Sequence, residues 1–307
     1  MTERIPFRVK PMLATRVAEP FHKPGWVYEE KYDGYRIFAY KEGDTVTLLS
    51  RNAKNRTASF PDIAASVARL TPHTLLLDGE VVAFDSHLVS RFQLLQRGDV
   101  PQIYVVFDCL YVNGRDLRGA PLRTRRRELE AATAESDRIL PSRRLAANGL
   151  RAYRLAKAKE FEGLVAKDAT SPYVQERSAR WLKVKIHQEE EFVVGGYTAP
   201  AGSRAHFGAL LLGAYRGTDL RYVGKVGTGF SQRTLTTLWT HFQPLIRRTT
   251  AFVDPPRERD VTWLAPQCVA QIAFGEWTHD RKLRHPVFLG LRTDKTPQEC
   301  LLPDDHV

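Results

Sequence analysis

A lysine beside an Asp-Gly pair is the residue of this chain best suited to covalent chemistry. Lys31 stands in the run Glu29-Glu30-Lys31-Tyr32-Asp33-Gly34-Tyr35-Arg36, between two strand-like stretches, 25–28 and 35–40. A lysine amine becomes a nucleophile when its surroundings lower its pKa. Glu30 and Asp33 favour the ammonium form, whereas nearby lysines and a metal ion would lower the pKa. Taken alone, the run is more simply explained as a charged turn with a hydrated lysine.

Further charged residues interrupt apolar, strand-like runs. They are Glu80 within 75–84, Glu162 and Lys167 around 163–166, and Lys183 and Lys185, which alternate with apolar residues in 181–186. Unpaired buried charge is costly, so these strands either lie at edges facing water or line a shared cleft. Together with the strand before Lys31 there are four such strands in one domain, and this number favours the cleft. Lysines in a cleft can neutralise a metal-bound triphosphate, and carboxylates can hold the metal.

Composition narrows the class of protein. The 307 residues suffice for two domains, and a hydrophobic fraction of 43% is typical of globular proteins. The excess of 46 basic over 35 acidic residues, +11, favours a polyanionic partner such as nucleic acid. Three dispersed cysteines give no zinc spacing and indicate a reducing compartment. The N-terminus shows no signal-peptide pattern and no run reaches membrane-spanning length, so we expect a cytoplasmic protein that does not contact a membrane.

Periodicity predicts an α+β chain of two domains, 1–188 and 189–307. In the first, helices are expected at 59–70, 123–133 and 150–160, with strands between them; residues 8–14 are expected to be irregular. The acidic stretch 187–191 is the predicted hinge. Beyond it we expect five strands, at 192–197, 209–215, 220–226, 268–274 and 287–291, and one helix, 231–242. Ser231 would cap that helix, with Leu235, Leu238, Trp239 and Phe242 inward. This order matches an OB-fold barrel.

Seven motifs in sequence order resemble those of the ATP-dependent DNA ligases of the covalent nucleotidyltransferase superfamily. The nearest resemblance is to bacterial end-joining ligase modules and stand-alone minimal ligases. The motifs are Lys31-Tyr32-Asp33-Gly34-Tyr35-Arg36, Ser50-Arg51-Asn52, Asp78-Gly79-Glu80, Val106-Phe107-Asp108-Cys109-Leu110-Tyr111, Glu162-Gly163-Leu164-Val165-Ala166-Lys167, Trp181-Leu182-Lys183-Val184-Lys185 and the segment 283–295. The resemblance covers nearly the whole chain. It implies a nucleotidyltransferase (adenylation) domain of antiparallel sheets and helices followed by an OB-fold domain.

The resemblance also implies roles for single residues. Lys31 would attack the α-phosphate of ATP and carry AMP, with a divalent metal, Mg²⁺ or Mn²⁺, on Glu162. Glu29 and Glu30, next to Lys31 in the first motif, would contact the nucleotide. Glu80 would hold the ribose, and Phe107 would stack on adenine. The phosphates would be contacted by Lys167, Lys183 and Lys185. Arg36 and Arg51 would bind the 5′-phosphate of a nick. Asp33 would lie near the reacting hydroxyl and be a second metal ligand. Arg292, Asp294 and Lys295 would orient the leaving pyrophosphate.

The implied activity is the sealing of 3′-hydroxyl/5′-phosphate nicks in duplex DNA, by a monomer, for repair or end joining. A Ku-like end-binding protein is a candidate partner. An RNA ligase or capping nucleotidyltransferase shares the lysine chemistry, and a non-catalytic OB-type DNA-binding protein is the alternative from another class. In one departure from the family pattern, Ala53 replaces a frequent glycine, which predicts a different turn after Arg51. Arg125–Arg127 and the pair Arg143-Arg144 are expected either to contact phosphate or to be solvated.

Overall fold

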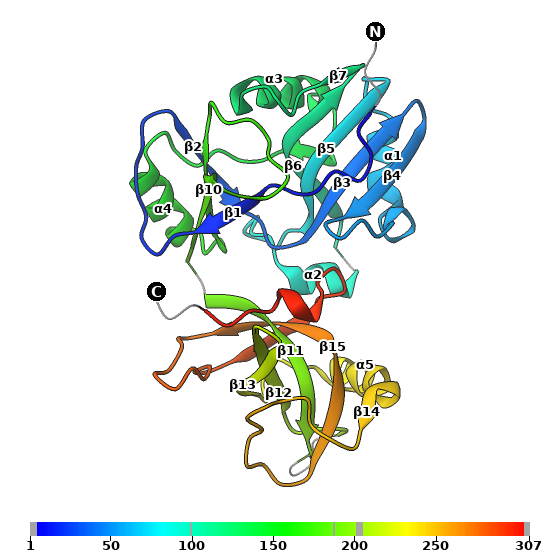
Figure 1. The fold of residues 1–307 in the computed structure, drawn as a ribbon. Coiled ribbons are helices and arrows are strands. Elements are labelled where there is room, and N and C mark those ends of the chain that lie inside the picture. The colour runs from blue at the N-terminus through cyan, green and yellow to red at the C-terminus, as the bar shows by residue number, and fades with distance from the viewer. Residues whose placement is uncertain (1–4, 99, 187, 201–204, 304–307) are drawn as a thin grey trace. The chain divides into compact units, whose positions relative to one another are not determined.

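Residues 5–98, 100–186, 188–200 and 205–303 are described by the structure, a computed structural model (Figure 1). Contacts divide the chain into two units, Met1–Ile186 and His187–Val307, a boundary two residues before the predicted one. Residues 1–4, where the sequence predicts no signal peptide, and His187 of the predicted hinge lie outside the described ranges. Within the described ranges, no helix is long and apolar enough to span a membrane.

The strand that ends at Lys31 belongs to a four-stranded sheet in the first unit. Its order is β1 (Leu13–Arg16), β10 (Arg177–Lys185), β9 (Gly163–Asp168) and β2 (Trp26–Lys31). β1 runs parallel to β10, and the other pairs are antiparallel. Helix α4 (Gly149–Ala158) covers one face through a buried cluster that includes Tyr28, Ala152 and Leu164. The predicted strands and helix are present, and β1 replaces part of the irregular lead-in.

A second sheet of the first unit presents Arg36 and Glu80. Its order is β4 (Thr45–Ser50), β3 (Tyr35–Glu42), β5 (Thr74–Ala83), β6 (Gln102–Val112) and β7 (Arg115–Asp116), with β8 (Ile139–Pro141) parallel to β6. The helical segments are η1 (Thr57–Ser59), α1 (Pro61–Ala68), α2 (Phe92–Arg97) and α3 (Leu122–Thr133). The short α2 was not predicted, because six residues carry too little periodicity.

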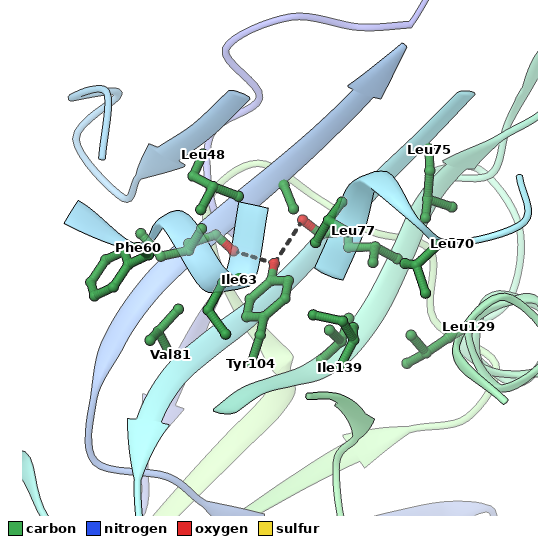
Figure 2. Packing of buried hydrophobic residues seen from close by; sticks show 14 of the residues in the cluster. Leu48, Phe60, Ile63, Leu70, Leu75, Leu77, Val81, Tyr104, Leu129 and Ile139 are labelled. Atoms are coloured by element: carbon green, nitrogen blue, oxygen red, sulfur yellow. Dashed lines mark hydrogen bonds between the residues drawn. The ribbon is translucent and has the colours of Figure 1, made fainter. Parts of the chain in front are cut away.

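Apolar side chains of α1 and α3 form the main core of this unit with the second sheet. Figure 2 shows Ile63 of α1 and Leu129 of α3 packed near Tyr104 of β6. The Tyr104 hydroxyl donates to the carbonyls of Ile37, at 2.7 Å, and Leu77, at 3.2 Å. These bonds satisfy a buried phenol and tie β6 to the two strands that carry site residues.

The second unit is one bent six-stranded sheet with a helix. The order is β13 (Asp219–Val226), β12 (Leu210–Arg216), β11 (Gln188–Thr198), β15 (Val261–Phe274) and β14 (Ile246–Arg247), with β16 (Val287–Leu291) paired to β15. The helical segments are α5 (Gln232–Phe242), η2 (Gln243–Leu245) and η3 (Pro297–Glu299). The register of β11 shifts between Val194 and Gly196, which bends the strand as barrels require. All five predicted strands and the helix are found, and β14 is additional.

The structure corrects two expectations for the second unit. Gln188–Glu191 of the predicted hinge stretch is regular strand, because β11 begins at Gln188 and pairs with β15 from its first residue; the boundary between the units falls just before that stretch, between Ile186 and His187. Trp239 does not point inward: it is 37% exposed and stacks on His206, with ring centroids 5.1 Å apart. The buried face of α5 is formed by the other three predicted positions, Leu235, Leu238 and Phe242. Ser231 does cap the helix, accepting from the Thr234 amide.

Candidate active site

One face of the four-stranded sheet gathers most of the predicted site. Lys31 and Lys185 both pair with Gly163 of β9, and Glu29 and Lys183 both pair with Val165. Directly paired residues of neighbouring strands project to the same side of a sheet. Glu29, Lys31, Lys183 and Lys185 therefore lie on one face in two adjacent rows. Lys167, which pairs with Val27 and Trp181, adds a third row.

Lys31 contacts a carboxylate directly. Its Nζ lies 2.5 Å from Glu162 Oε2, and the side chains are 21% and 9% exposed. Burial alone would lower the pKa of the Lys31 amine. The nearby carboxylates of Glu162, Asp33 and Glu80 outweigh burial and raise the pKa above its ordinary value. The lysine is therefore held as an ammonium ion, and it becomes a nucleophile only when Glu162 is neutralised or moved.

Glu29 is the centre of a buried network beside Lys31. Its Oε2 accepts from Lys167 Nζ at 2.6 Å and from Ser142 Oγ at 2.7 Å, and Arg126 Nη1 lies 3.5 Å from Oε1. Burial lowers the pKa of Lys167 in spite of Glu29. Lys167 Nζ also lies 4.3 Å from the centroid of the Trp181 ring. These contacts fix both side chains on the site face.

Phe107 connects the two sheets of the first unit. Its ring centroid lies 4.8 Å from Lys167 Nζ on the four-stranded sheet and 5.2 Å from Arg36 Cζ on the second sheet. Arg36 is paired with Glu80 across β3 and β5. The Phe107 ring thus joins two parts of the site. One is the sheet face with Glu29 and Lys31, and the other is the strand pair with Arg36 and Glu80.

The Arg36 guanidinium is held by a buried carboxylate. Its Nε and Nη2 donate to the two oxygens of Asp78, at 2.9 and 2.6 Å, and the Tyr173 hydroxyl also donates to Asp78, at 2.7 Å. The Asp78 side chain is fully buried and that of Arg36 is 15% exposed. A bidentate pair of this kind fixes the orientation of the arginine while leaving part of it at the surface.

Asp33 and Arg51 lie on separate loops of the first unit. Asp33 accepts from the Phe92 amide at the start of α2, at 3.1 Å, and Ser90 Oγ accepts from the Asp33 amide, at 3.0 Å. Arg51 lies in the turn after β4. Ala53 in that turn adopts φ +55°, the left-handed conformation that glycine favours.

Glu30 and the arginines of α3 are not part of this site face. Strand alternation turns Glu30 to the opposite side, where its fully buried carboxylate lies 3.4 Å from Arg143 Nη1. Arg125 is buried and donates to both oxygens of Asp108, so it neither contacts solvent nor is available to phosphate, and both expectations for it are wrong. Arg126 is buried on Glu29. Arg127 is solvated, with a side chain 77% exposed.

The predicted residues of the second unit form a network of their own. Arg292 donates to both oxygens of Asp294, each at 2.8 Å, and to Gln271 Oε1 at 2.8 Å. Lys295 Nζ lies 3.2 Å from Glu191 Oε1. Arg292 holds the pKa of Asp294 below its ordinary value although burial opposes this. In this structure these cations are partnered within their own unit.

The donor set suits a divalent cation bound together with a substrate phosphate. Across the described ranges, no three His, Cys, Asp or Glu side chains converge as a metal cage. Mg²⁺ and similar ions commonly take one or two carboxylates and complete their coordination with phosphate oxygens and water. Glu162, beside Lys31 on the site face, is the carboxylate that fits this role.

The sequence patterns did not reveal the residues that hold the site side chains. Ser142 and Arg126 fix Glu29, and Asp78 and Tyr173 fix Arg36. One signal was available for Arg126: it shares with Leu122 and Leu129 the helical spacing that marks the buried face of α3. A charge at such a position needs a buried partner.

Fold and site together define a nucleotidyltransferase with a lysine at the end of a strand and a second, OB-type β unit. Family models agree: the "ATP dependent DNA ligase domain" matches residues 11–185, and the "ATP dependent DNA ligase C terminal region" matches 203–295. The chain belongs to the ATP-dependent DNA ligase family. The predicted α+β class, an adenylation-type unit followed by an OB-type unit, is confirmed.

Two groups of curated relatives are similar to the chain. The "multifunctional non-homologous end joining protein LigD" of Pseudomonas aeruginosa is 38% identical over 309 residues, which cover 96% of this chain and 36% of that protein. The "DNA ligase" of Thermococcus fumicolans is 33% identical, over 95% of this chain and 57% of that protein. The chain thus spans about a third to three fifths of the length of these relatives.

Solved structures agree with this assignment. A mycobacterial DNA ligase D, solved in complex with ATP and MES, has a TM-score of 0.75 and 32% identity, covering 97% of this chain and all of that one. The ligase domain of LigD from M. tuberculosis has a TM-score of 0.56, at the same identity and coverage.

Proposed function

We propose that this protein is an ATP-dependent DNA ligase that seals 3′-hydroxyl/5′-phosphate nicks through a lysyl-AMP intermediate on Lys31. The observation that supports this most directly is the shared sheet face of Lys31, Glu29, Lys183 and Lys185, with Glu162 hydrogen-bonded to the Lys31 amine. A nucleophile, a carboxylate and two further cations on one surface are what in-line phosphoryl transfer from ATP requires.

The first step forms a P–N bond and breaks a P–O bond. Lys31 Nζ gives up a proton and attacks the α-phosphorus of ATP, and pyrophosphate leaves with the electron pair. Lys185 lies in the same row as Lys31, and Lys183 lies in the same row as Glu29. Both lysines stabilise the negative charge that spreads over the phosphate oxygens. Phe107 would stack on the adenine ring, and Glu29, Glu80 and Lys167 are the other proposed nucleotide contacts.

Glu162 connects the protonation of Lys31 to ion binding. A divalent ion, Mg²⁺ or Mn²⁺, held by Glu162 with Asp33 nearby would supply positive charge to the phosphates. A Glu162 carboxylate engaged in this way no longer raises the pKa of Lys31. The amine then loses its proton more readily in the loaded enzyme than in the free one.

The next two steps use the second sheet. The 5′-phosphate of the nick takes AMP from Lys31, and the 3′-hydroxyl then displaces AMP to close the backbone. Arg36, with its orientation fixed by Asp78, and Arg51 would bind the 5′-phosphate. Asp33 would lie near the attacking hydroxyl. Arg292 and Lys295 would orient pyrophosphate in the first step, after they exchange Asp294 and Glu191 for the substrate.

The biological setting is proposed from the relatives. The name of the LigD relatives, "non-homologous end joining protein", supports a role in end joining or repair, on nicked duplex DNA. We propose that the protein works as a monomer in the cytoplasm, with a Ku-like end-binding protein as a candidate partner. The free, buried cysteines are compatible with a reducing compartment.

Self-adenylylation tests the mechanism. Incubation with α-labelled ATP and magnesium should yield an acid-stable, hydroxylamine-labile labelled protein. Lys31→Ala should abolish the label, and Lys157→Ala, which removes an exposed lysine of α4, should retain it. Nicked duplexes with DNA or RNA 3′-hydroxyl strands then identify the substrate. Label in Lys31→Ala would refute the mechanism, and sealing of RNA strands only, or use of GTP, would favour the RNA ligase or capping alternative.

A further inference from the structure

The outward face of helix α4 has no part in the function proposed above. Small residues form the buried face of this helix, and the opposite face carries two neighbouring rows of residues four apart in sequence. One row is Leu150 and Arg154, and the other is Arg151 and Leu155. The two leucines are 44% and 38% exposed, and both arginines are exposed. We call these four residues the outer α4 patch.

The positive charge of the outer α4 patch is not neutralised by the protein itself. In the described ranges, no carboxylate pairs with the side chain of Arg151 or Arg154. The stretch 138–159 contains no Asp or Glu, although it holds several further basic residues. Glu160, the first acidic residue after this stretch, lies 3.8 Å from Arg91. Both guanidinium groups are therefore available to the carboxylates of another molecule.

The outer α4 patch lies on the opposite side of the four-stranded sheet from Lys31. Tyr28 and Leu164 form a buried cluster with Ala152 of α4. Glu29 and Lys31 alternate with Tyr28 along β2, so they project from the other face of the sheet. Figure 1 shows α4 at the outside of the first unit, beside β2 and β10. A substrate bound over Lys31 would thus leave the patch open to a second partner.

The mixture of side chains in the patch favours a protein partner over a nucleic acid. A phosphate backbone would gain from the two arginines, but it would offer the two leucines nothing to pack against. Protein interfaces combine apolar contacts with arginine at their centre and contain less lysine there. In the patch, the arginines stand between the leucines, and Lys157 lies at its border.

We propose that the outer α4 patch docks an acidic, amphipathic helix of a protein partner. Rows of residues four apart are the ridges through which two helices pack. Apolar side chains of the partner would cover Leu150 and Leu155. Its carboxylates would pair with Arg151 and Arg154, and arginine forms such pairs through two parallel hydrogen bonds.

Fluorescence anisotropy of the full chain with a synthetic peptide tests this docking surface. The probe is a labelled peptide of Glu, Ala and Leu with its leucines three and four residues apart, and in a second peptide serine replaces each leucine. The leucine peptide should bind saturably and more tightly than the serine peptide. The double variant Leu150→Ser with Leu155→Ser should weaken binding of the leucine peptide by about tenfold. Arg151→Gln with Arg154→Gln should weaken binding of both peptides.

A matched pair on α3 controls for the loss of charge. Arg123→Gln with Arg127→Gln removes two exposed arginines from another helix of the same unit, and it should leave peptide binding unchanged. Far-UV circular dichroism and the urea midpoint should match wild type in every variant, because the altered side chains are exposed. None of these measurements uses ATP or ligation, so their outcome is independent of the proposed function.

Three results would each overturn the proposal. The first is the lack of saturable binding of the leucine peptide. The second is equal weakening by the α3 control pair and by the Arg151 and Arg154 pair, which would mean that binding depends on net charge alone. The third is unchanged binding in the leucine variant together with displacement of the peptide by intact duplex DNA, which would assign the arginines of α4 to nucleic acid instead.

Discussion

Replacing Glu30 with glutamine should remove a loss of stability that the wild-type protein undergoes as the pH rises from 4.5 to 8. The Glu30 side chain is fully buried, with the Arg143 guanidinium 3.4 Å from its carboxylate and the Tyr32 hydroxyl as a hydrogen-bond neighbour. Burial raises its pKa from 4.5 to about 7, although Arg143 opposes the rise. Folding at pH 8 thus buries a charge that is only partly compensated.

The magnitude follows from the two pKa values. Between pH 4.5 and 7 the folded protein keeps a proton on Glu30 that the unfolded chain has released, so the free energy of unfolding falls as pH rises through this range. Each unit of difference between the two pKa values corresponds to about 1.4 kcal/mol of unfolding free energy. The loss of unfolding free energy therefore approaches ~3 kcal/mol above pH 7 and vanishes below pH 4.5. Glu30→Gln has no carboxyl to titrate and escapes this loss.

Urea unfolding of wild type and Glu30→Gln at a series of pH values between 4.5 and 8 measures the effect. Between pH 4.5 and pH 8, the free energy of unfolding of the variant should rise by about 2–3 kcal/mol relative to that of wild type. This change with pH is expected whether or not the two proteins differ in stability at pH 4.5. Glu160→Gln, which removes a glutamate with a 74% exposed side chain from the same unit, controls for the lost charge. A stability difference that is the same at pH 5 and pH 8 would refute this reasoning.

Three further variants test other parts of the first unit. Glu162→Gln should lower the pKa of Lys31, so amine-reactive reagents at pH 8 should modify Lys31 faster than in wild type; an unchanged rate would contradict the Glu162 contact. Ala53→Gly should raise the free energy of urea unfolding by up to about 1 kcal/mol, because φ +55° strains alanine, and a loss of stability would contradict this. Arg125→Met should cost about 3–5 kcal/mol by leaving Asp108 buried without its partner. The double variant with Asp108→Leu should recover much of that cost, and failure to do so would show that packing dominates.

The fold was largely predictable because its elements carry strong local signals. The strand 45–50 and the strand 287–291 were predicted with the bounds that the structure gives them. Their apolar runs end at turn signals, which act over a few residues. The short elements β7, β14 and α2 were missed, since two to six residues hold no measurable period and form through contacts with the rest of the unit.

The hinge shows where composition misled the prediction. An acidic run was expected to be a linker, yet Gln188–Glu191 pairs with β15, and Glu191 contacts Lys295. Glu191 thus faces a cation of its own unit, a partner that only the tertiary structure supplies.

The sequence alone selected the residues that we propose carry the chemistry: motif order pointed to Lys31, Glu162, Lys183 and Lys185. Only the tertiary structure decided their protonation and their surroundings. The pKa of Lys31 rises because Glu162, 131 residues away, lies 2.5 Å from its amine. Strand alternation placed Glu29 and Glu30, neighbours in sequence, in opposite environments. Charges interact through space, and the fold sets those distances.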